Sequence, residues 1–240
     1  MSKPQIWKST VGKKVLASVS GLALVAFVIV HLIGNLTLFV GRDGKLFNSY
    51  AHHLESLGPL LYVAEVGLIL IVVLHIATAL GVRIGQRRAR PEGYGVYGSK
   101  HGPSKQTLAS RSMAITGVII LLFIPLHVWM FKFNAGRGFT AVDFDGHTVK
   151  DLYLVVLTAF KDPVKAWAYV GIMALLGLHL RHGFWSAFQS LGAFAPKRLP
   201  AFYAAGLICA LLLAAGFIAL PLYLLYCGPD PATLRGGVGG

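Results

Sequence analysis

Charged side chains are scarce in this sequence. They make up 13% of its 240 residues, whereas 55% of the residues are hydrophobic. A soluble globular domain usually carries roughly a quarter charged residues. The composition therefore excludes an ordinary soluble domain and predicts a membrane protein.

Cysteine is almost absent. Cys209 and Cys227 are the only two cysteines, and both lie in or beside one apolar stretch. This excludes a disulfide framework, a cysteine zinc site, an iron–sulfur quartet and a Cys-x-x-Cys-His haem attachment. Any cofactor must be held by other residues.

Acidic residues are few as well. Nine Asp and Glu stand against 22 Lys and Arg, which gives a formal net charge of +13. In a soluble chain this excess would suggest nucleic acid, but in a membrane protein it is first a signal of topology. We therefore expect contact with membrane lipid and no nucleic-acid partner.

Long apolar runs dominate what is present. A helix needs about 20 apolar residues to cross a bilayer, and five segments meet this requirement: 15–40, 58–84, 112–132, 164–190 and 201–226. We predict an all-α membrane protein, a five-helix bundle forming one domain over 1–228, followed by a short flexible tail at 229–240. No internal repeat is obvious.

The connections between the spans indicate the orientation. Thirteen cations lie on the side of the N-terminus and eight on the side of the C-terminus. The positive-inside rule places the cation-rich side, and with it the N-terminus, in the cytoplasm.

Five of the nine histidines lie inside the spans: His31, His75, His127, His179 and His182. An ionisable side chain at such depth indicates function by default. A single histidine in a span could equally form a structural hydrogen bond to a neighbouring helix. Four helices that each carry one are much harder to explain in that way.

Two of these histidines are expected near the outer surface. His31 lies about 25 Å along its helix from Lys14, and His127 about 24 Å from Arg111, at 1.5 Å per residue. Both distances start from the cytoplasmic side. We call His31 and His127 the outer pair.

Two others are expected near the inner surface. His75 and His179 each follow a proline, Pro59 and Pro163, by sixteen residues, about 24 Å along helices that run inward. We call His75 and His179 the inner pair. The two pairs should differ in depth by on the order of 10 Å.

Two imidazoles facing each other at one depth can supply both axial ligands of a haem iron. Two such pairs predict two stacked b-type haems, with iron held by the outer and the inner pair. Zinc would prefer a compact tetrahedral set with another class of ligand. A proton relay would tolerate the placement without requiring matched depths.

Two hydroxyls lie at the level of the inner pair. Ser20 and Thr116 precede His31 and His127 by eleven residues, three helical turns. They could hydrogen-bond the inner haem. A bond back to their own helix is the equally weighted alternative.

Cations near the inner surface could bind haem propionates or simply extend to the interface. They are Arg83, Arg111 and Arg181. His182 lies one turn beyond His179, so spacing alone leaves both open as the ligand, and the equal proline offsets favour His179.

Several stretches together resemble the dihaem cytochrome b membrane-anchor subunit of succinate dehydrogenase and fumarate reductase, the succinate:quinone oxidoreductases or respiratory complex II. The resemblance extends over about residues 9–226. It rests on five stretches: STVGKKVL at 9–16, VHLIGN at 30–35, FNSYAH at 47–52, HVW at 127–129 and HLRHGFWS at 179–186.

This resemblance implies two haems with ligands from the first four spans, His31, His75, His127 and His179. It also implies a flavoprotein and an iron–sulfur partner on the cytoplasmic face of a prokaryotic membrane, and a quinone, typically menaquinone. Electrons from succinate, in the tricarboxylic acid cycle, would pass from the iron–sulfur subunit through the haems to the quinone. This chain alone would not bind or oxidise succinate, and the complex could form a higher oligomer.

Some members of the family carry a proton-conducting glutamate two residues before the fourth ligand, where this chain has Gly177. Glu65 is the only carboxylate in the spans and could exchange protons with a quinone or make a neutral helix contact. An outer quinone site could also use loop residues near the first span: Asn35, Asn48, Ser49, His52 and His53.

Two alternatives remain at this point. One is a haem b membrane subunit of another respiratory oxidoreductase, such as a formate dehydrogenase or a hydrogenase. The other is a proton-coupled transporter that uses the histidines as a relay.

Overall fold

The computed structural model describes residues 9–89, 108–133, 141–144, 147–192 and 199–235. Five helices in this part of the chain are long and apolar enough to cross a membrane. The predicted number of spans is therefore confirmed. The long helices are α1 (Thr10–Asn35), α3 (Pro59–Ala89), α4 (Leu108–Val128), α6 (Pro163–Ser190) and α7 (Leu199–Tyr226).

The starts of these helices follow from local chemistry. The Ser9 side chain accepts a hydrogen bond of 2.9 Å from the amide of Gly12 at the start of α1. Asp162 caps α6 in the same way, and Pro163 occupies a first-turn position where a missing amide proton costs little. A hydrogen bond from Lys165 lowers the pKa of Asp162, so this cap remains ionised at neutral pH.

The helix α4 is interrupted near its end. Pro125 lies inside the helix, which continues beyond Val128 as a π-helical turn, η3 (Trp129–Phe133). Proline removes one backbone hydrogen bond, and a π-turn shifts the side chains that follow it around the helix axis. His127 lies between these two irregularities.

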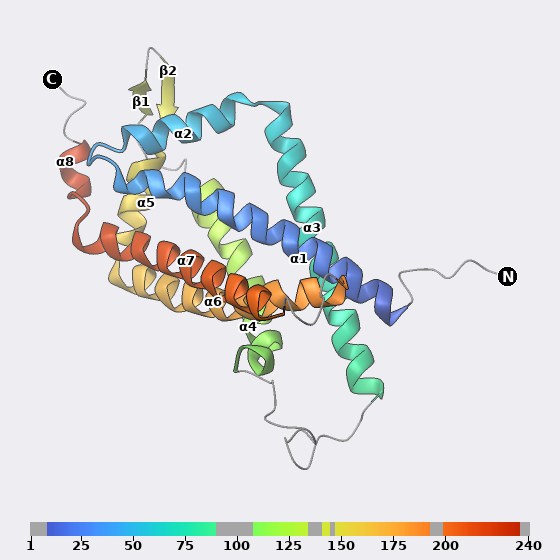
Figure 1. The fold of residues 1–240 in the computed structure, drawn as a ribbon. Helices are drawn as coiled ribbons and strands as arrows, with labels where there is room; N and C mark the ends of the chain where they lie inside the picture. The colour runs from blue at the N-terminus through green and yellow to red at the C-terminus, as the bar shows by residue number, and fades with distance from the viewer. Residues whose placement is uncertain (1–8, 90–107, 134–140, 145–146, 193–198, 236–240) are drawn as a thin grey trace.

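The shorter elements gather at one end of the molecule, beyond the C-terminal end of α1 (Figure 1). We call this end the cap. Its elements are η2 (Leu36–Phe39), α2 (Lys45–Ser56), the strands β1 (Ala141–Phe144) and β2 (His147–Lys150), α5 (Leu152–Phe160) and α8 (Pro231–Arg235). The strands form an antiparallel hairpin in which Ala141 pairs with Lys150.

The cap departs from the sequence prediction in two respects. The sequence predicts no element between the third and the fourth spans, yet this connection contains the hairpin and α5, six of whose nine residues are buried. Part of the tail expected to be flexible forms the short helix α8. The apolar run of α5 is too short to cross a membrane, so a search for spans does not predict this helix.

The four helices that carry the histidine pairs form an incomplete ring. The helix α1 packs against α3 and α6, and α4 packs against α6, while α7 covers α6 and part of α1. Within these described helices, α3 and α4 make little direct contact. The diagonal pairs, α1 with α4 and α3 with α6, also make little direct contact. The ring is thus least closed between α3 and α4.

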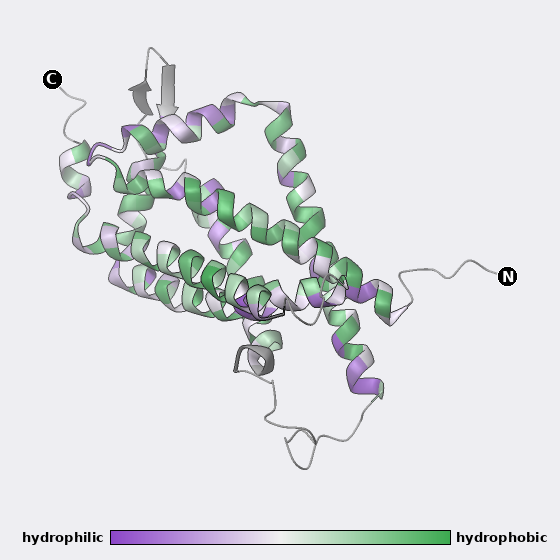
Figure 2. Ribbon diagram, viewed as in Figure 1, coloured by the Kyte–Doolittle hydropathy of each residue, from purple (hydrophilic) through white to green (hydrophobic). Residues whose placement is uncertain are grey.

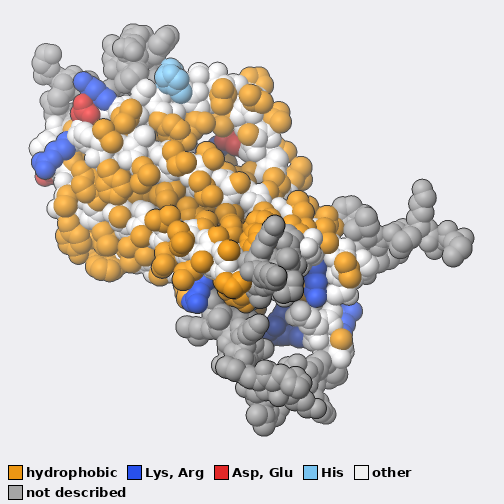
Figure 3. Space-filling model, in the orientation of Figure 1, with side chains coloured by type: hydrophobic (Ala, Val, Ile, Leu, Met, Phe, Trp, Pro, Cys, Tyr) orange, Lys and Arg blue, Asp and Glu red, His pale blue; other side chains and the backbone are white. Residues whose placement is uncertain are grey.

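Hydrophobic residues line the long helices along most of their length, whereas polar residues concentrate on α2 and on the far end of α3 (Figure 2). In the space-filling view, hydrophobic side chains form a broad belt with Lys and Arg gathered at its margins (Figure 3). This distribution is the one that a lipid bilayer requires.

Candidate cofactor site between four helices

The outer pair meets across the bundle. The rings of His31 in α1 and His127 in α4 are edge to face, with centroids 5.9 Å apart and planes at 89°. Two metal–imidazole bonds of about 2 Å, with each ring centre about 1 Å beyond its nitrogen, would place the centroids roughly 6 Å apart. The separation therefore suits one iron held by both rings.

Aromatic side chains enclose the outer pair. Phe27 stacks on His31 with centroids 5.5 Å apart, and Phe217 lies at 5.8 Å. The His127 ring is bordered by Phe123, Phe131 and Tyr169 at 5.3, 5.3 and 6.0 Å. A flat apolar macrocycle would find an apolar aromatic lining here.

In the inner pair, His75 of α3 lies against α1. Its Nδ1 is 3.1 Å from the carbonyl oxygen of Ala17 and 3.3 Å from the hydroxyl of Ser20. The Ser20 hydroxyl also donates to the Leu16 carbonyl of its own helix at 2.7 Å. The predicted bond of Ser20 to its own helix is present, and the hydroxyl also lies against an inner histidine, while its bond to a haem stays a prediction.

His179 of α6 lies against α4 in the same manner. Its Nδ1 is 3.1 Å from the hydroxyl of Thr116, which is 1% exposed. Thr116 also bonds back to the carbonyls of Ser112 and Met113 at 3.1 and 3.2 Å. The structure thus brings Thr116 to His179.

A glycine beside each hydroxyl makes room for the ring. A Cβ added at Gly21 would lie 3.1 Å from Cε1 of His75, and one at Gly117 would lie 3.4 Å from Cε1 of His179. Each imidazole therefore lies directly on the backbone of the neighbouring helix.

The two halves of the bundle repeat one arrangement. Ser20-Gly21 precedes His31 by the same number of residues as Thr116-Gly117 precedes His127. Phe27 and Phe123, four residues before each histidine, also correspond, while the remaining aligned positions of the two helices differ. Eleven residues correspond to about 16 Å along a helix, which is the separation of the two levels along α1.

The chemistry of the donors fits haem iron. A metal-bound histidine usually gives its second ring N–H to an oxygen, and Nδ1 of both inner histidines has such a partner, which leaves Nε2 for a metal. Within the described residues no three His, Cys, Asp or Glu side chains gather as a metal site. Pairs without a third ligand argue against zinc.

The other inner candidates have different surroundings. His182 is edge-on to Trp185, with centroids 5.6 Å apart, and Trp185 stacks on Tyr203 of α7 at 4.4 Å. Arg83 and Arg181 are exposed. Arg111 belongs to α4, but its side chain is outside the described residues.

Asn48 belongs to a buried network in the cap. Its amide donates to Asp151 Oδ1 at 2.9 Å, and its carbonyl oxygen accepts from the Tyr153 amide at 2.8 Å. Asp151 also accepts from the Leu154 amide at 2.9 Å and so caps α5. Asn48 is 4% exposed and joins α2 to α5, which is a structural role.

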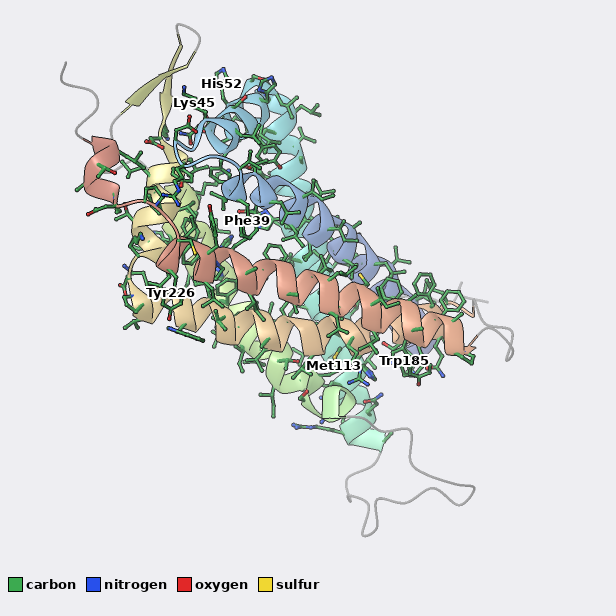
Figure 4. The ribbon with its side chains drawn as sticks, turned by 60° about the vertical axis from the view of Figure 1, so that its left-hand side comes forward. Phe39, Lys45, His52, Met113, Trp185 and Tyr226 are labelled. Atoms are coloured by element: carbon green, nitrogen blue, oxygen red, sulfur yellow. The ribbon has the colours of Figure 1, made fainter. Side chains whose placement is uncertain are left out.

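The remaining outer candidates are dispersed. Asn35 donates to the His31 carbonyl at 2.8 Å, with its amide nitrogen 3.5 Å from Nε2 of the same histidine. His53 donates to the Ser49 carbonyl at 2.9 Å, and its ring centroid is 6.4 Å from that of His52. Figure 4 shows His52 on α2 in the cap, at the opposite end from Trp185.

Glu65 forms an ion pair with Lys132. The carboxylate belongs to α3 and the ammonium to η3, so the pair spans the side of the ring where α3 and α4 otherwise make little contact. About a third of the Glu65 side chain is exposed. Glu65 is thus a charged group at the open side of the bundle.

Gly177 packs against α7. A Cβ there would lie 2.8 Å from the Cβ of Ala214 and 3.7 Å from the carbonyl of Ala210. The position therefore has no space for a glutamate side chain on this backbone, which agrees with its being glycine.

Comparison with known proteins gives one further finding. The chain is similar to the succinate dehydrogenase cytochrome b558 subunit of Bacillus subtilis (strain 168), with 27% identity over 168 residues that cover 67% of this chain and 69% of that protein. No family model and no solved structure matches the chain. The arrangement of paired histidines is thus found in a chain similar to a cytochrome b subunit of succinate dehydrogenase.

Proposed function

We propose that this chain is the membrane-anchor cytochrome b subunit of a succinate:quinone oxidoreductase in a prokaryotic cytoplasmic membrane, with its N-terminus in the cytoplasm. The observation that carries the proposal is that the rings of His31 and His127 meet, with centroids 5.9 Å apart. Three helical turns away along α1 and α4, the hydroxyls of Ser20 and Thr116 contact the two inner histidines. The similarity to a cytochrome b558 subunit supports the same assignment.

In this proposal the outer and the inner pair each hold one haem b. The two haems, when bound, supply one-electron carriers at two depths of the membrane. The histidine nitrogens of this chain would hold the iron. Ala17, Ser20 and Thr116 fix the rings of the inner pair, and the aromatic residues around the outer pair exclude water.

The partners proposed are a flavoprotein and an iron–sulfur protein on the cytoplasmic side. The iron–sulfur protein would deliver electrons derived from succinate at the end of the bundle nearest the inner pair. That end also carries the exposed cations Arg83, Arg87 and Arg88 of α3.

A quinone, proposed to be menaquinone, would react near the outer pair. Its reduction consumes two electrons and two protons, so an acid–base group must lie close to the ring. Glu65 is that group in our proposal, because it lies at the open side between α3 and α4, where a lipid-soluble molecule can approach.

Purification of the tagged chain from its native membranes tests the assignment. We expect a covalent flavoprotein and an iron–sulfur protein to co-purify, and succinate to produce the reduced b-haem spectrum. A b-type spectrum that responds to formate or hydrogen but not to succinate would assign the chain to another oxidoreductase. The absence of any b-type spectrum would favour the transporter.

The quinone site has its own test. Glu65→Gln should lower succinate-driven quinone reduction at least tenfold, while succinate still reduces both haems. The matched control is Glu55→Gln, on the exposed surface of α2, which should leave the rate unchanged. Equal rates in the two variants would place the quinone elsewhere.

A further inference from the structure

Tyr169 of α6 lies at the centre of the aromatic residues beside the outer pair. Its ring centroid is 4.9 Å from that of Phe160, 5.0 Å from that of Phe123 and 6.1 Å from that of Phe131. Three elements besides α6 supply these rings: α4, η3 and α5. The phenol is therefore held in place by packing from several directions.

The hydroxyl of Tyr169 makes two polar contacts. It lies 3.2 Å from Nδ1 of His127 and donates to Sδ of Met130 at 3.9 Å. The sulfur is a weak acceptor, but it gives the phenol proton a partner other than His127.

That second partner allows the phenol oxygen to act as the acceptor in the bond to histidine. A neutral imidazole has one N–H and one bare nitrogen, and a metal takes the bare one. With its own proton directed to Met130, the phenol oxygen of Tyr169 can accept the Nδ1–H of His127. The nitrogen left for a metal is then Nε2.

We propose that Tyr169 is a positioning residue of the outer pair, which accepts a hydrogen bond from His127 and so selects the tautomer that presents Nε2 to iron. The inference rests on the proposed haem function and adds to it a residue that acts through His127. It also gives the outer pair a counterpart to the hydroxyls of Ser20 and Thr116 at the inner pair.

A redox titration of the intact complex tests this role. In Tyr169→Phe the stacking remains and the hydrogen bond is lost, so His127 donates less electron density and the oxidised iron is less stabilised. We expect the haem content to be unchanged. The midpoint potential of the outer haem should rise by an amount that corresponds to roughly a fivefold change in its reduction equilibrium, and the midpoint potential of the inner haem should not change. The outer component is identified as the one missing in His31→Ala.

Tyr203→Phe is the matched control, because the Tyr203 ring stacks on Trp185 rather than on a ring of either pair. It should move neither potential. Both haems present with unshifted potentials in Tyr169→Phe would overturn the role of Tyr169, and so would an equal shift in Tyr203→Phe.

If Tyr169→Phe loses the outer haem, a second variant tests the same role. Met130→Leu keeps the phenol but removes the acceptor of its proton, and we expect a smaller upward shift of the outer potential alone. No shift in Met130→Leu would then overturn the proposal. Absence of b-type haem from the unaltered complex is a different result, which would refute the proposed function itself.

Discussion

The outer and the inner pair are built from the same residue type in different surroundings. The outer histidines lie among aromatic rings, and His127 meets a phenol. The inner histidines lie on glycine backbone, with a carbonyl and two hydroxyls at Nδ1.

The two pairs therefore show two ways in which a membrane protein fixes the orientation of an imidazole ring. The outer pair is fixed largely by packing. Side chains of α4, α6 and η3 border His127, with α5 behind them, and side chains of α1 and α7 border His31. The inner pair is fixed by short polar contacts within the helix pairs α1–α3 and α4–α6. The His127 side of the outer pair therefore depends in part on α5 of the cap, whereas the inner pair depends on two helix–helix contacts.

The largest effect is expected where the inner pair has no spare space. Gly21→Val should abolish the inner haem, because the added Cβ alone would lie 3.1 Å from the His75 ring. Haem per protein should fall by half. Gly67→Val is the control, since a Cβ there meets nothing within 4 Å, and two haems retained in both variants would contradict the close contact.

Loosening the cap should affect the outer pair selectively. Asn48→Ala removes the partner of the Tyr153 amide, at a cost of about 1–3 kcal/mol for a buried group, and leaves Asp151 Oδ1 with the Leu154 amide alone. On heating, the variant should lose the outer haem before the inner one, as followed by the reduced absorption band. Ser49→Ala should behave like the unaltered chain, and simultaneous loss of both haems in Asn48→Ala would argue against a separate cap.

The two halves of the inner site should respond unequally. Thr116→Val removes the hydroxyl at His179, whereas Ser20→Ala leaves His75 bonded to the Ala17 carbonyl. We expect Thr116→Val to shift the inner potential by the equivalent of roughly fivefold in the reduction equilibrium, and Ser20→Ala to shift it less. The reverse order would show that the Ala17 carbonyl is not the main partner of His75.

The smallest effect is expected at the neighbouring histidine. His182→Gln should retain both haems with near-normal potentials, because Thr116 contacts His179 and His182 lies beside Trp185. Haem content after purification decides this point, and loss of the inner haem would exchange the roles of the two histidines.

The sequence predicts the spans well, because a bilayer imposes the length of an apolar helix. Helix lengths and proline offsets also predict that His31 pairs with His127, and the structure brings these two rings together. The residues that contact the imidazole rings are harder to predict from the sequence. Three-turn spacing indicates Ser20 and Thr116. Tyr169 contacts His127 from another helix, and the spacing does not give the rotation of that helix about its axis.

Other features depend on contacts that a single sequence does not reveal. The buried helix α5 has too short an apolar run to stand out in a hydropathy profile, and Asn48 resembles a solvated loop residue until Asp151 is placed beside it. The ion pair of Glu65 with Lys132 depends on how η3 turns after Pro125.

Haem stoichiometry in single histidine variants tests the central claim most directly. The account predicts two b-type haems per chain, and one in either His31→Ala or His75→Ala. The haem that remains should have a different midpoint potential in each variant. Two haems in both variants, or the same haem lost from both, would contradict the assignment of one haem to each pair.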